Sequence, residues 1–154
     1  MAPHHKSAKV MVSPPESPGA YSLRTPPVDN FLEVRASEIH GKGLFTTVFI
    51  PAGRRVIDYD AEVINEEERV RRSPRYKQRS RVPLFFQLEA DRVLDVMNPD
   101  AGDWFYANHS CNPNMWSKVY GRTGSKKMLL YAKRDIQPGE ELTFDYTQRR
   151  IYRA

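Results

Sequence analysis

Four side chains that could do chemistry lie within the seven residues NHSCNPN, at positions 108–114. The segment holds the single cysteine of the chain, Cys111, with His109 two positions before it and an asparagine at each end. In an extended segment, residues two positions apart point to the same side, so the imidazole could act as a base for the thiol. The same residues could instead form half of a metal site, or a turn that positions other groups.

Metal and nucleophile chemistry find little support elsewhere in the sequence. A structural zinc needs about four Cys, His or carboxylate ligands at suitable spacing. His40 is distant from His109, His4 and His5 precede the first apolar segment, and no CxxC or HxxxH pattern occurs. We therefore expect no metal site. A lone cysteine is most often a small buried apolar residue, which favours a packed Cys111 over a nucleophile.

Aromatic residues beside polar turns are the remaining candidates. HGKG at 40–43 lacks the spacing of a phosphate-binding loop, and the adjacent Glu140 and Glu141 follow a glycine turn, which is typical of structural carboxylates. The aromatic residues could line a narrow channel for a cationic or methyl-bearing group, although their types alone favour ordinary core packing. They are Tyr59, Phe85, Phe86, Trp104, Phe105, Tyr106, Phe144 and Tyr146.

Length and charge set broad limits on the class of protein. With 154 residues, a formal charge of +5 and a pI of about 9.4, the chain is expected to form one domain and to favour an acidic partner such as nucleic acid. No run of about 18 apolar residues predicts a membrane helix, and the N-terminal residues lack the apolar core of a secretory signal. A single cysteine excludes a framework of disulfides within the chain and favours a reducing compartment.

The elements that must position these residues are short. Residues 1–29 hold six of the twelve prolines and predict a disordered arm, which leaves a domain at 30–146 and a short tail at 147–154. Alternating or β-branched segments predict strands between glycine turns. These segments are 31–37, 44–50, 54–64, 82–89, 92–97, 126–136 and 142–146. Many short strands with one modest helix predict an α+β fold that is mostly β.

One helix is predicted at residues 65–72, NEEERVRR. Asn65 can cap it, glutamates suit its start, arginines suit its end, and Pro74 is expected to stop it. A short helix or turn is expected in 102–110, leading into NHSCNPN. Residues 69–81 carry seven Lys or Arg and no acid, which indicates either a solvated helix end or a nucleic-acid patch.

Four motifs occur in an order that resembles the SET domain, the protein-lysine methyltransferase family. They are SEIHGKGLFTT (37–47), FIPAGRRVIDYDAEVI (49–64), NHSCNPN (108–114) and RDIQPGEELTFDY (134–146). Any one motif alone would be weak, but their order across residues 33–146 is specific. The resemblance implies small curved β-sheets with a C-terminal pseudoknot, in which the last segment threads under a loop made by the preceding one.

The resemblance also implies a cofactor, S-adenosylmethionine. Asn108 matches the residue that hydrogen-bonds the methionine end, and His109 matches the residue that supports the adenine side. The family's cofactor loop binds largely through backbone groups, and glycine permits the close approach that this requires. The matching loop residues are His40, Gly41, Lys42 and Gly43. The turn that forms the knot is matched by Cys111, Pro113 and Asn114.

Tyr146 matches the family's catalytic tyrosine, which would orient a lysine amine and the sulfonium methyl group for in-line transfer. Free lysine has a pKa of about 10.4, so the enzyme must align a neutral amine and exclude water. Tyr59 would assist catalysis from the wall of the lysine channel. The implied channel residues are Tyr59, Phe86, Tyr106 and Phe144. Phenylalanine at 144 resembles the family's tyrosine/phenylalanine switch and favours di- or trimethylation.

The resemblance implies a lysine-bearing protein substrate, most often a histone tail, and a nuclear or nucleocytoplasmic location. Nucleosomal DNA could contact residues 69–81. No membrane partner is expected, and the sequence leaves the oligomeric state open. Acids that could meet a basic tail are Glu62, Asp91, Asp95 and Asp100. The cysteine-rich zinc segments that flank many relatives are missing, so the tail at 147–154 would have to close the lysine channel.

Two alternatives remain at the level of sequence. GDWFY at 102–106 replaces the family's asparagine–arginine pattern before NHS. This replacement favours a catalytically silent SET module that binds a histone tail or a protein partner. The other alternative is a methyltransferase that acts on a non-histone protein.

Overall fold

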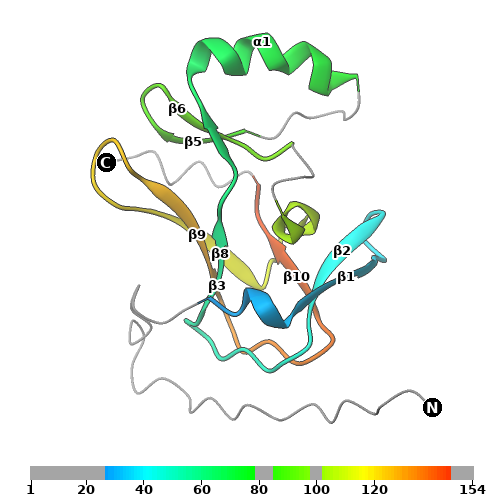
Figure 1. Ribbon diagram of the computed structural model, residues 1–154. Coiled ribbons are helices and arrows are strands. Elements are labelled where there is room, and N and C mark those ends of the chain that lie inside the picture. The colour runs from blue at the N-terminus through cyan, green and yellow to red at the C-terminus, as the bar shows by residue number, and fades with distance from the viewer. Residues whose placement is uncertain (1–26, 79–84, 98–101, 147–154) are drawn as a thin grey trace, which may run out of the picture.

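The computed structural model describes residues 27–78, 85–97 and 102–146, which form three small β-sheets and one α-helix (Figure 1). The first sheet has the order β1 (Leu32–Ala36), β2 (Lys42–Thr46), β10 (Glu141–Phe144), β7 (Asn108–His109). The second has the order β3 (Arg55–Tyr59), β9 (Lys127–Ala132), β8 (Met115–Tyr120). The third has the order β4 (Glu62–Ile64), β6 (Arg92–Asp95), β5 (Phe85–Glu89). The helical elements are η1 (Asp29–Phe31), α1 (Glu66–Lys77) and η3 (Asp103–Tyr106). The predicted α+β fold that is mostly β is confirmed.

The last strand, β10, is inserted into the first sheet between two segments that precede it in the chain. It pairs antiparallel with β2, with Leu142 opposite Leu44, and parallel with β7, with Phe144 opposite His109. The Ser110 N–H donates to the Phe144 carbonyl at 3.2 Å and extends the parallel pairing by one residue. This order is the one that a threaded C-terminal segment requires, and it brings the end of β10 beside NHSCNPN.

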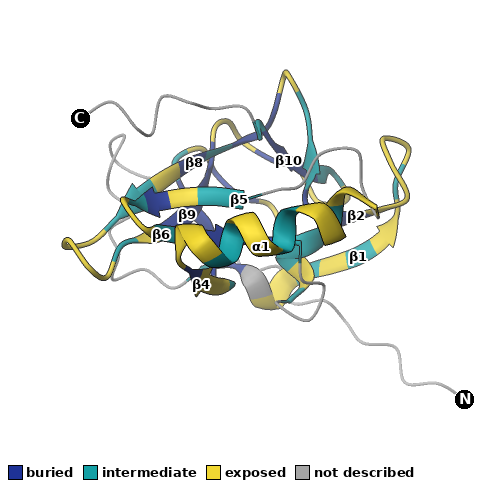
Figure 2. Ribbon diagram, turned by 90° about the horizontal axis from the view of Figure 1, so that it is seen from above, coloured by how far each residue is buried: buried dark blue, intermediate teal, exposed yellow. Residues whose placement is uncertain are grey.

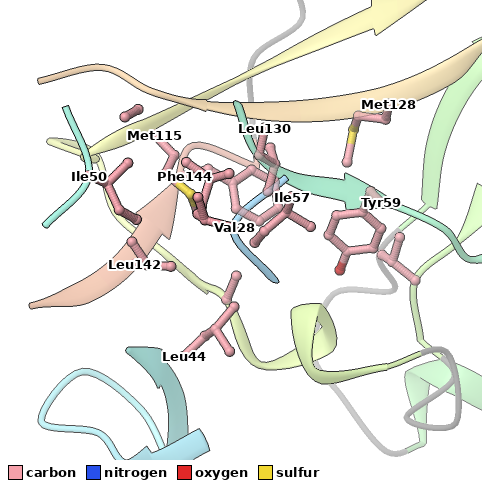
Figure 3. Close-up of a cluster of buried hydrophobic side chains, with 14 of the residues drawn as sticks. Val28, Leu44, Ile50, Ile57, Tyr59, Met115, Met128, Leu130, Leu142 and Phe144 are labelled. Atoms are coloured by element: carbon pink, nitrogen blue, oxygen red, sulfur yellow. The ribbon is translucent and has the colours of Figure 1, made fainter. Parts of the chain in front are cut away.

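A common core lies between the first two sheets (Figure 3). Leu44, Leu142 and Phe144 from the first sheet pack with Ile57 and Leu130 from the second, and none of the five is more than 1% exposed. Fully burying a side chain of this size contributes about 1.5–3 kcal/mol. The end of β10 is therefore fixed by packing before any polar contact is considered.

The helix α1 begins where the sequence predicts but continues through Pro74. Asn65 Oδ1 accepts a hydrogen bond from the Glu68 N–H at 2.8 Å, as a helix cap should. Pro74 removes one backbone donor, yet the last turn is held from outside, because the Tyr76 hydroxyl donates to the buried Asp95 carboxylate at 2.7 Å. The prediction that Pro74 ends the helix is therefore wrong. Figure 2 shows α1 on the outside of the molecule, without a buried residue.

Several strand limits differ from the predictions. The predicted strand 44–50 ends at Thr46, because its Oγ1 donates to the Val48 carbonyl at 2.7 Å and accepts from the Val48 N–H at 3.2 Å, which bends the chain. The predicted segment 54–64 divides into β3 and β4, which belong to different sheets. In the segment 126–136 the strand β9 ends at Ala132, and Ile136 forms a separate antiparallel bridge with Ile50. The sequence patterns do not predict β8, which pairs with β9 over its whole length.

The predicted N-terminal arm overlaps the fold at its end. Residues 1–26 of the arm and the tail at 147–154 lie outside the described residues. Val28 is only 8% exposed, and its N–H donates to the Val56 carbonyl at 3.1 Å. Residues 27–29, which the sequence assigns to the arm, are thus part of the folded domain. Within the described ranges, no helix is both long and apolar enough to cross a bilayer.

Candidate active site

Asn108 lies where the predicted cofactor loop meets the last strand. Its side-chain nitrogen lies 3.2 Å from the His40 carbonyl oxygen and 3.1 Å from that of Lys42. It also lies 2.8 Å from Glu141 Oε1 and 3.2 Å from Ser37 Oγ. A carboxamide has two N–H donors, so these four acceptors share them. The structure therefore brings the predicted loop and the NHS motif together through one side chain.

The two loop glycines have different roles. Gly41 has a φ of +46° and open space where a side chain would stand, so it serves the turn. At Gly43, an added Cβ would lie 2.2 Å from Glu141 Oε1, so its missing side chain lets β2 and β10 approach closely. That carboxylate also accepts from Ser37 Oγ at 2.8 Å. Glu141 is thus a structural acid, as the glycine turn predicts.

Asn114 clamps the last strand from the other side of the NHS turn. Its side-chain nitrogen donates to the Glu141 carbonyl at 2.7 Å, and its Oδ1 accepts from the Thr143 N–H at 2.9 Å. The residue is only 4% exposed. A single buried carboxamide thus satisfies one acceptor and one donor of the β10 backbone, in the way that a neighbouring strand would.

Tyr146 is fixed at three points beside the NHS motif. Its hydroxyl donates to the Ala107 carbonyl at 2.5 Å, and its backbone N–H donates to His109 Nδ1 at 3.1 Å. Its ring centroid lies 4.8 Å from that of Phe144 and 5.2 Å from that of His109. The predicted catalytic hydroxyl is therefore held rigidly, with His109 acting on the backbone that carries it.

Cys111 is exposed, so the prediction of a packed cysteine is wrong. Its Sγ lies 3.4 Å from His109 Nε2. Because His109 Nδ1 accepts the Tyr146 N–H, the neutral ring must carry its proton on Nε2, the nitrogen that faces the thiol. That nitrogen is a donor rather than a base, so the pair is not arranged for nucleophilic catalysis. Turn geometry at the surface, rather than burial, positions this cysteine.

Four aromatic side chains converge behind Tyr146. The ring centroid of Phe144 lies 6.2 Å from that of Tyr59 and 5.8 Å from that of Phe86. The Phe86 centroid lies 6.4 Å from that of Tyr146. We call Tyr59, Phe86, Trp104, Phe144 and Tyr146 the aromatic cluster. Trp104 joins it at 6.5 Å from Tyr59; the sequence names Trp104 among the aromatic candidates, but the resemblance does not place it among the channel residues. Its only signal is a large aromatic residue inside GDWFY, the segment that departs from the family pattern.

Tyr106, which the sequence places in the channel, lies apart from the aromatic cluster. Its ring packs on Phe105 at 5.2 Å, and the Lys42 ammonium lies 6.0 Å from its centroid. It therefore stands beside the predicted cofactor loop. Tyr106 lies outside the aromatic cluster and Trp104 lies inside it because the short helix η3 directs these two side chains toward different neighbours.

Burial controls the proton affinity of the tyrosines in the cluster. Loss of solvent raises the pKa of Tyr146 to about 12. Burial raises the pKa of Tyr59 further, and the neighbouring Tyr146 adds to the rise. Both hydroxyls stay protonated at neutral pH, so they can orient groups by hydrogen bonding but do not act as anionic bases.

These tyrosines predict alkaline unfolding with a defined onset. Burial also raises the pKa of Tyr131 to about 12, whereas unfolded tyrosine titrates at about 10. Above pH 10 the unfolded chain releases protons that the native protein keeps, so the contribution of these tyrosines to stability should be constant below about pH 10 and fall between about pH 10 and 12. Denaturant unfolding across this range, with tyrosinate absorbance as the second signal, measures the effect. Native tyrosines that all titrate near pH 10 would contradict it.

Charged residues around α1 are largely engaged with one another. Arg69 and Arg71 pair with Glu66 and Glu68 along the helix. Arg72 binds Glu62, Glu68 and the buried Asp95. Glu62 and Asp95, two of the acids that could meet a basic tail, are therefore already paired with Arg72. The third, Asp91, accepts the Glu66 N–H at 3.0 Å, and the fourth, Asp100, lies outside the described residues. Residues 79–81 of the basic run also lie outside the described residues.

In the described ranges, no group of three or more His, Cys, Asp or Glu is placed to hold a metal.

Comparison with known proteins gives the family. The sequence matches the SET domain over residues 41–147. The chain is 38% identical over 118 residues to histone-lysine N-methyltransferase trithorax of Drosophila virilis, and 34% identical over 116 residues to histone-lysine N-methyltransferase, H3 lysine-4 specific, of Mycosarcoma maydis. It is 37% identical over 116 residues to histone-lysine N-methyltransferase set1 of Dictyostelium discoideum. These alignments cover 76%, 75% and 75% of the chain but only 3%, 8% and 8% of the relatives. Because the SET match spans most of the chain and includes the NHS motif and Tyr146, this protein belongs to the SET-domain family.

Proposed function

We propose that this protein is a protein-lysine methyltransferase that uses S-adenosylmethionine and acts on a histone tail. The observation that carries the proposal is the position of Tyr146, whose hydroxyl and backbone are both held beside the NHS motif and whose ring closes the aromatic cluster. Family membership and the names of the relatives support the same chemistry. A histone substrate would place the protein in the nucleus.

The loop beside Asn108 offers the polar groups that the methionine end of S-adenosylmethionine needs. That end carries an ammonium, which needs acceptors, and a carboxylate, which needs donors or a cation. The His40 and Lys42 carbonyls are acceptors, and the Lys42 side chain is an exposed cation. The residues fit the cofactor, and His40, Lys42, Asn108 and His109 would hold it.

When bound, the cofactor supplies a methyl group on a positively charged sulfur. The Tyr146 hydroxyl donates a hydrogen bond to the Ala107 carbonyl, so its oxygen lone pairs stay available to accept from a lysine amine or a polarised methyl group. His109 fixes the backbone of Tyr146, which limits the directions that the hydroxyl can take. The apolar faces of Phe86 and Phe144 would exclude water and favour the neutral amine, whose pKa in water is about 10.4.

Phe144→Tyr should shift the products toward monomethyl-lysine. Phe144 is 1% exposed, between Tyr59 and Tyr146, so an added hydroxyl would enter the aromatic cluster and occupy space needed for a second methyl group. Mass spectrometry of a methylated peptide over time measures the product ratio. Phe105→Tyr is the matched control, since Phe105 packs on Tyr106 outside the cluster. A product ratio that is unchanged by Phe144→Tyr would contradict the proposed preference for di- or trimethylation.

Two measurements separate this proposal from its alternatives. Calorimetry with S-adenosylmethionine tests cofactor binding, and radiolabelled methyl transfer to core histones, nucleosomes and a peptide array tests the substrate. Binding heat together with labelled histones would support the proposal. Binding heat with label only on non-histone peptides would indicate a different substrate class. An absence of heat would favour a silent module that binds a tail or partner.

A further inference from the structure

The outer face of the β8–β9 hairpin carries a second set of aromatic residues, remote from the core. Along β8, Met115 and Ser117 are buried, whereas Trp116, Lys118 and Tyr120 alternate with them and point the other way. The register places Tyr131 opposite Trp116 and Lys127 opposite Tyr120, so their side chains share that outer face. We call Trp116, Lys118, Tyr120, Lys127 and Tyr131 the hairpin face. Figure 1 shows the loop of this hairpin at the edge of the molecule, on the side of the β5–β6 hairpin.

The three aromatic rings form a rigid layer. Trp116 stacks on Tyr131 with centroids 5.0 Å apart and planes 21° apart, and Tyr120 lies 6.3 Å from Tyr131. Tyr131 is only 5% exposed, while Trp116 and Tyr120 are half-buried above it. None of the three belongs to the hydrophobic core cluster or packs against it. The layer is therefore not needed to close the core, and it leaves two aromatic rings partly accessible to solvent.

Cations surround these rings. Lys118 and Lys127 are exposed on the face, and the Lys118 ammonium lies 4.4 Å from the Tyr120 ring centroid. Arg122 and Lys126 follow in the connecting loop. These four cations form no ion pair with any described residue. On the neighbouring strand β3, Asp58 is paired with Arg55.

The hairpin loop is held in place from the third sheet. Glu89 accepts the Gly124 N–H at 2.8 Å, and the Arg92 guanidinium donates to the Gly124 carbonyl. The cations of the loop are thus presented on an anchored turn. On α1, by contrast, Arg69, Arg71 and Arg72 are each neutralised by glutamate or aspartate, which leaves Arg75 and Lys77 as the cations of that helix without a described ion pair.

We propose that the hairpin face binds single-stranded nucleic acid, with Trp116 and Tyr120 stacking on bases and Lys118 and Lys127 contacting phosphates. Aromatic rings on a sheet within a cationic surround are the general means of binding such strands, because every unpaired base has a face that can stack. Trp116 and Tyr120 are four positions apart on one strand, which separates their backbone positions by about 13 Å, and Lys118 lies between them. Paired bases hide their faces, so a duplex could use only the cations. The chain's net charge of +5 favours the same polyanion.

Fluorescence anisotropy with a labelled oligouridine tests the proposal in the full chain without S-adenosylmethionine, so its outcome stands apart from methyl transfer. A strand of about 20 nucleotides exceeds the sites typical of comparable binding surfaces. The double variant Lys118→Glu/Lys127→Glu should weaken binding at least about tenfold and lower the salt slope by about 1.4. Arg75→Glu/Lys77→Glu changes the net charge equally on α1 and should have a much smaller effect. Equal losses in the two variants would overturn the proposal.

The stacking role has its own readout. The chain has two tryptophans, so Trp104→Phe leaves Trp116 as the single reporter. Added oligouridine should quench its emission, and circular dichroism confirms that the variant is folded. Unchanged emission at saturating oligouridine would overturn the role of Trp116.

Competing ligands test the occupant of the hairpin face. Tighter binding of a duplex of the same length would assign the face to duplex DNA, and equal competition by polyglutamate would assign it to an acidic protein. Either result would overturn the single-strand proposal.

Discussion

Tyr146→Phe should lower methyl transfer at least about a hundredfold while the fold stays intact, because a preorganised polar group at the reacting atoms is typically worth that much. The substitution removes one hydroxyl, which donates to the Ala107 carbonyl. The ring contacts with Phe144 and His109, and the backbone hydrogen bond to His109, do not depend on the hydroxyl. We therefore expect kcat to fall with little change in cofactor affinity, measured by single-turnover transfer and calorimetry.

Tyr106→Phe is the matched control for this experiment. Tyr106 is also half-buried and precedes the same NHS motif, but its hydroxyl makes no hydrogen bond to a described residue and its ring lies outside the aromatic cluster. Its activity should stay close to that of the wild type. Full activity in Tyr146→Phe, with the cofactor still bound, would remove Tyr146 from the mechanism. Equal losses in both variants would show that the effect is structural.

Asn114→Ala should lower the free energy of unfolding by about 2–6 kcal/mol, the largest stability effect that we expect from one side chain at the site. The substitution leaves the Glu141 carbonyl and the Thr143 N–H without their partners inside a buried segment, and each such loss costs about 1–3 kcal/mol. Equilibrium unfolding in urea measures the change. Because the clamp holds β10, cofactor binding should weaken in the same variant.

Asn112→Ala supplies the comparison two residues earlier in the same turn. Asn112 is exposed, and only its backbone N–H takes part in a hydrogen bond, to Ser110 Oγ. Surface changes of this kind usually alter stability by less than about 0.5 kcal/mol. A loss below about 1 kcal/mol in Asn114→Ala, or similar losses in the two variants, would show that the carboxamide is not the clamp.

Local signals in the sequence were sufficient wherever one residue decides the structure. Asn65 marks the start of α1, and Gly41 marks the turn before β2. The ordered motifs lead to the SET family and bring Asn108, His109 and Tyr146 together. These predictions depend on short-range backbone chemistry or on motif order, both of which can be read along the chain.

The errors occur where a distant contact overrides the local pattern. Asp95, nineteen positions from Tyr76, helps to hold the turn of α1 that follows Pro74. β8 is defined by its pairing with β9, and its mixture of polar and aromatic residues reflects two different faces. Cys111 is exposed although cysteines are usually buried, because the NHS turn directs it outward beside His109. Trp104 joins the site through contacts that no spacing rule predicts.

The insertion of β10 has a consequence for how the site is assembled in time. Ser37 and Glu141, which meet beside the predicted cofactor loop, are 104 positions apart in the chain. Contacts between residues so distant in sequence form late and slow the folding of a domain, because the intervening loop must be closed first. A nascent chain can complete the first hairpin early, but the loop gains its Glu141 and Asn108 contacts only after β10 has docked. We therefore expect the predicted site to be completed only when β10 docks, late in the folding of the domain.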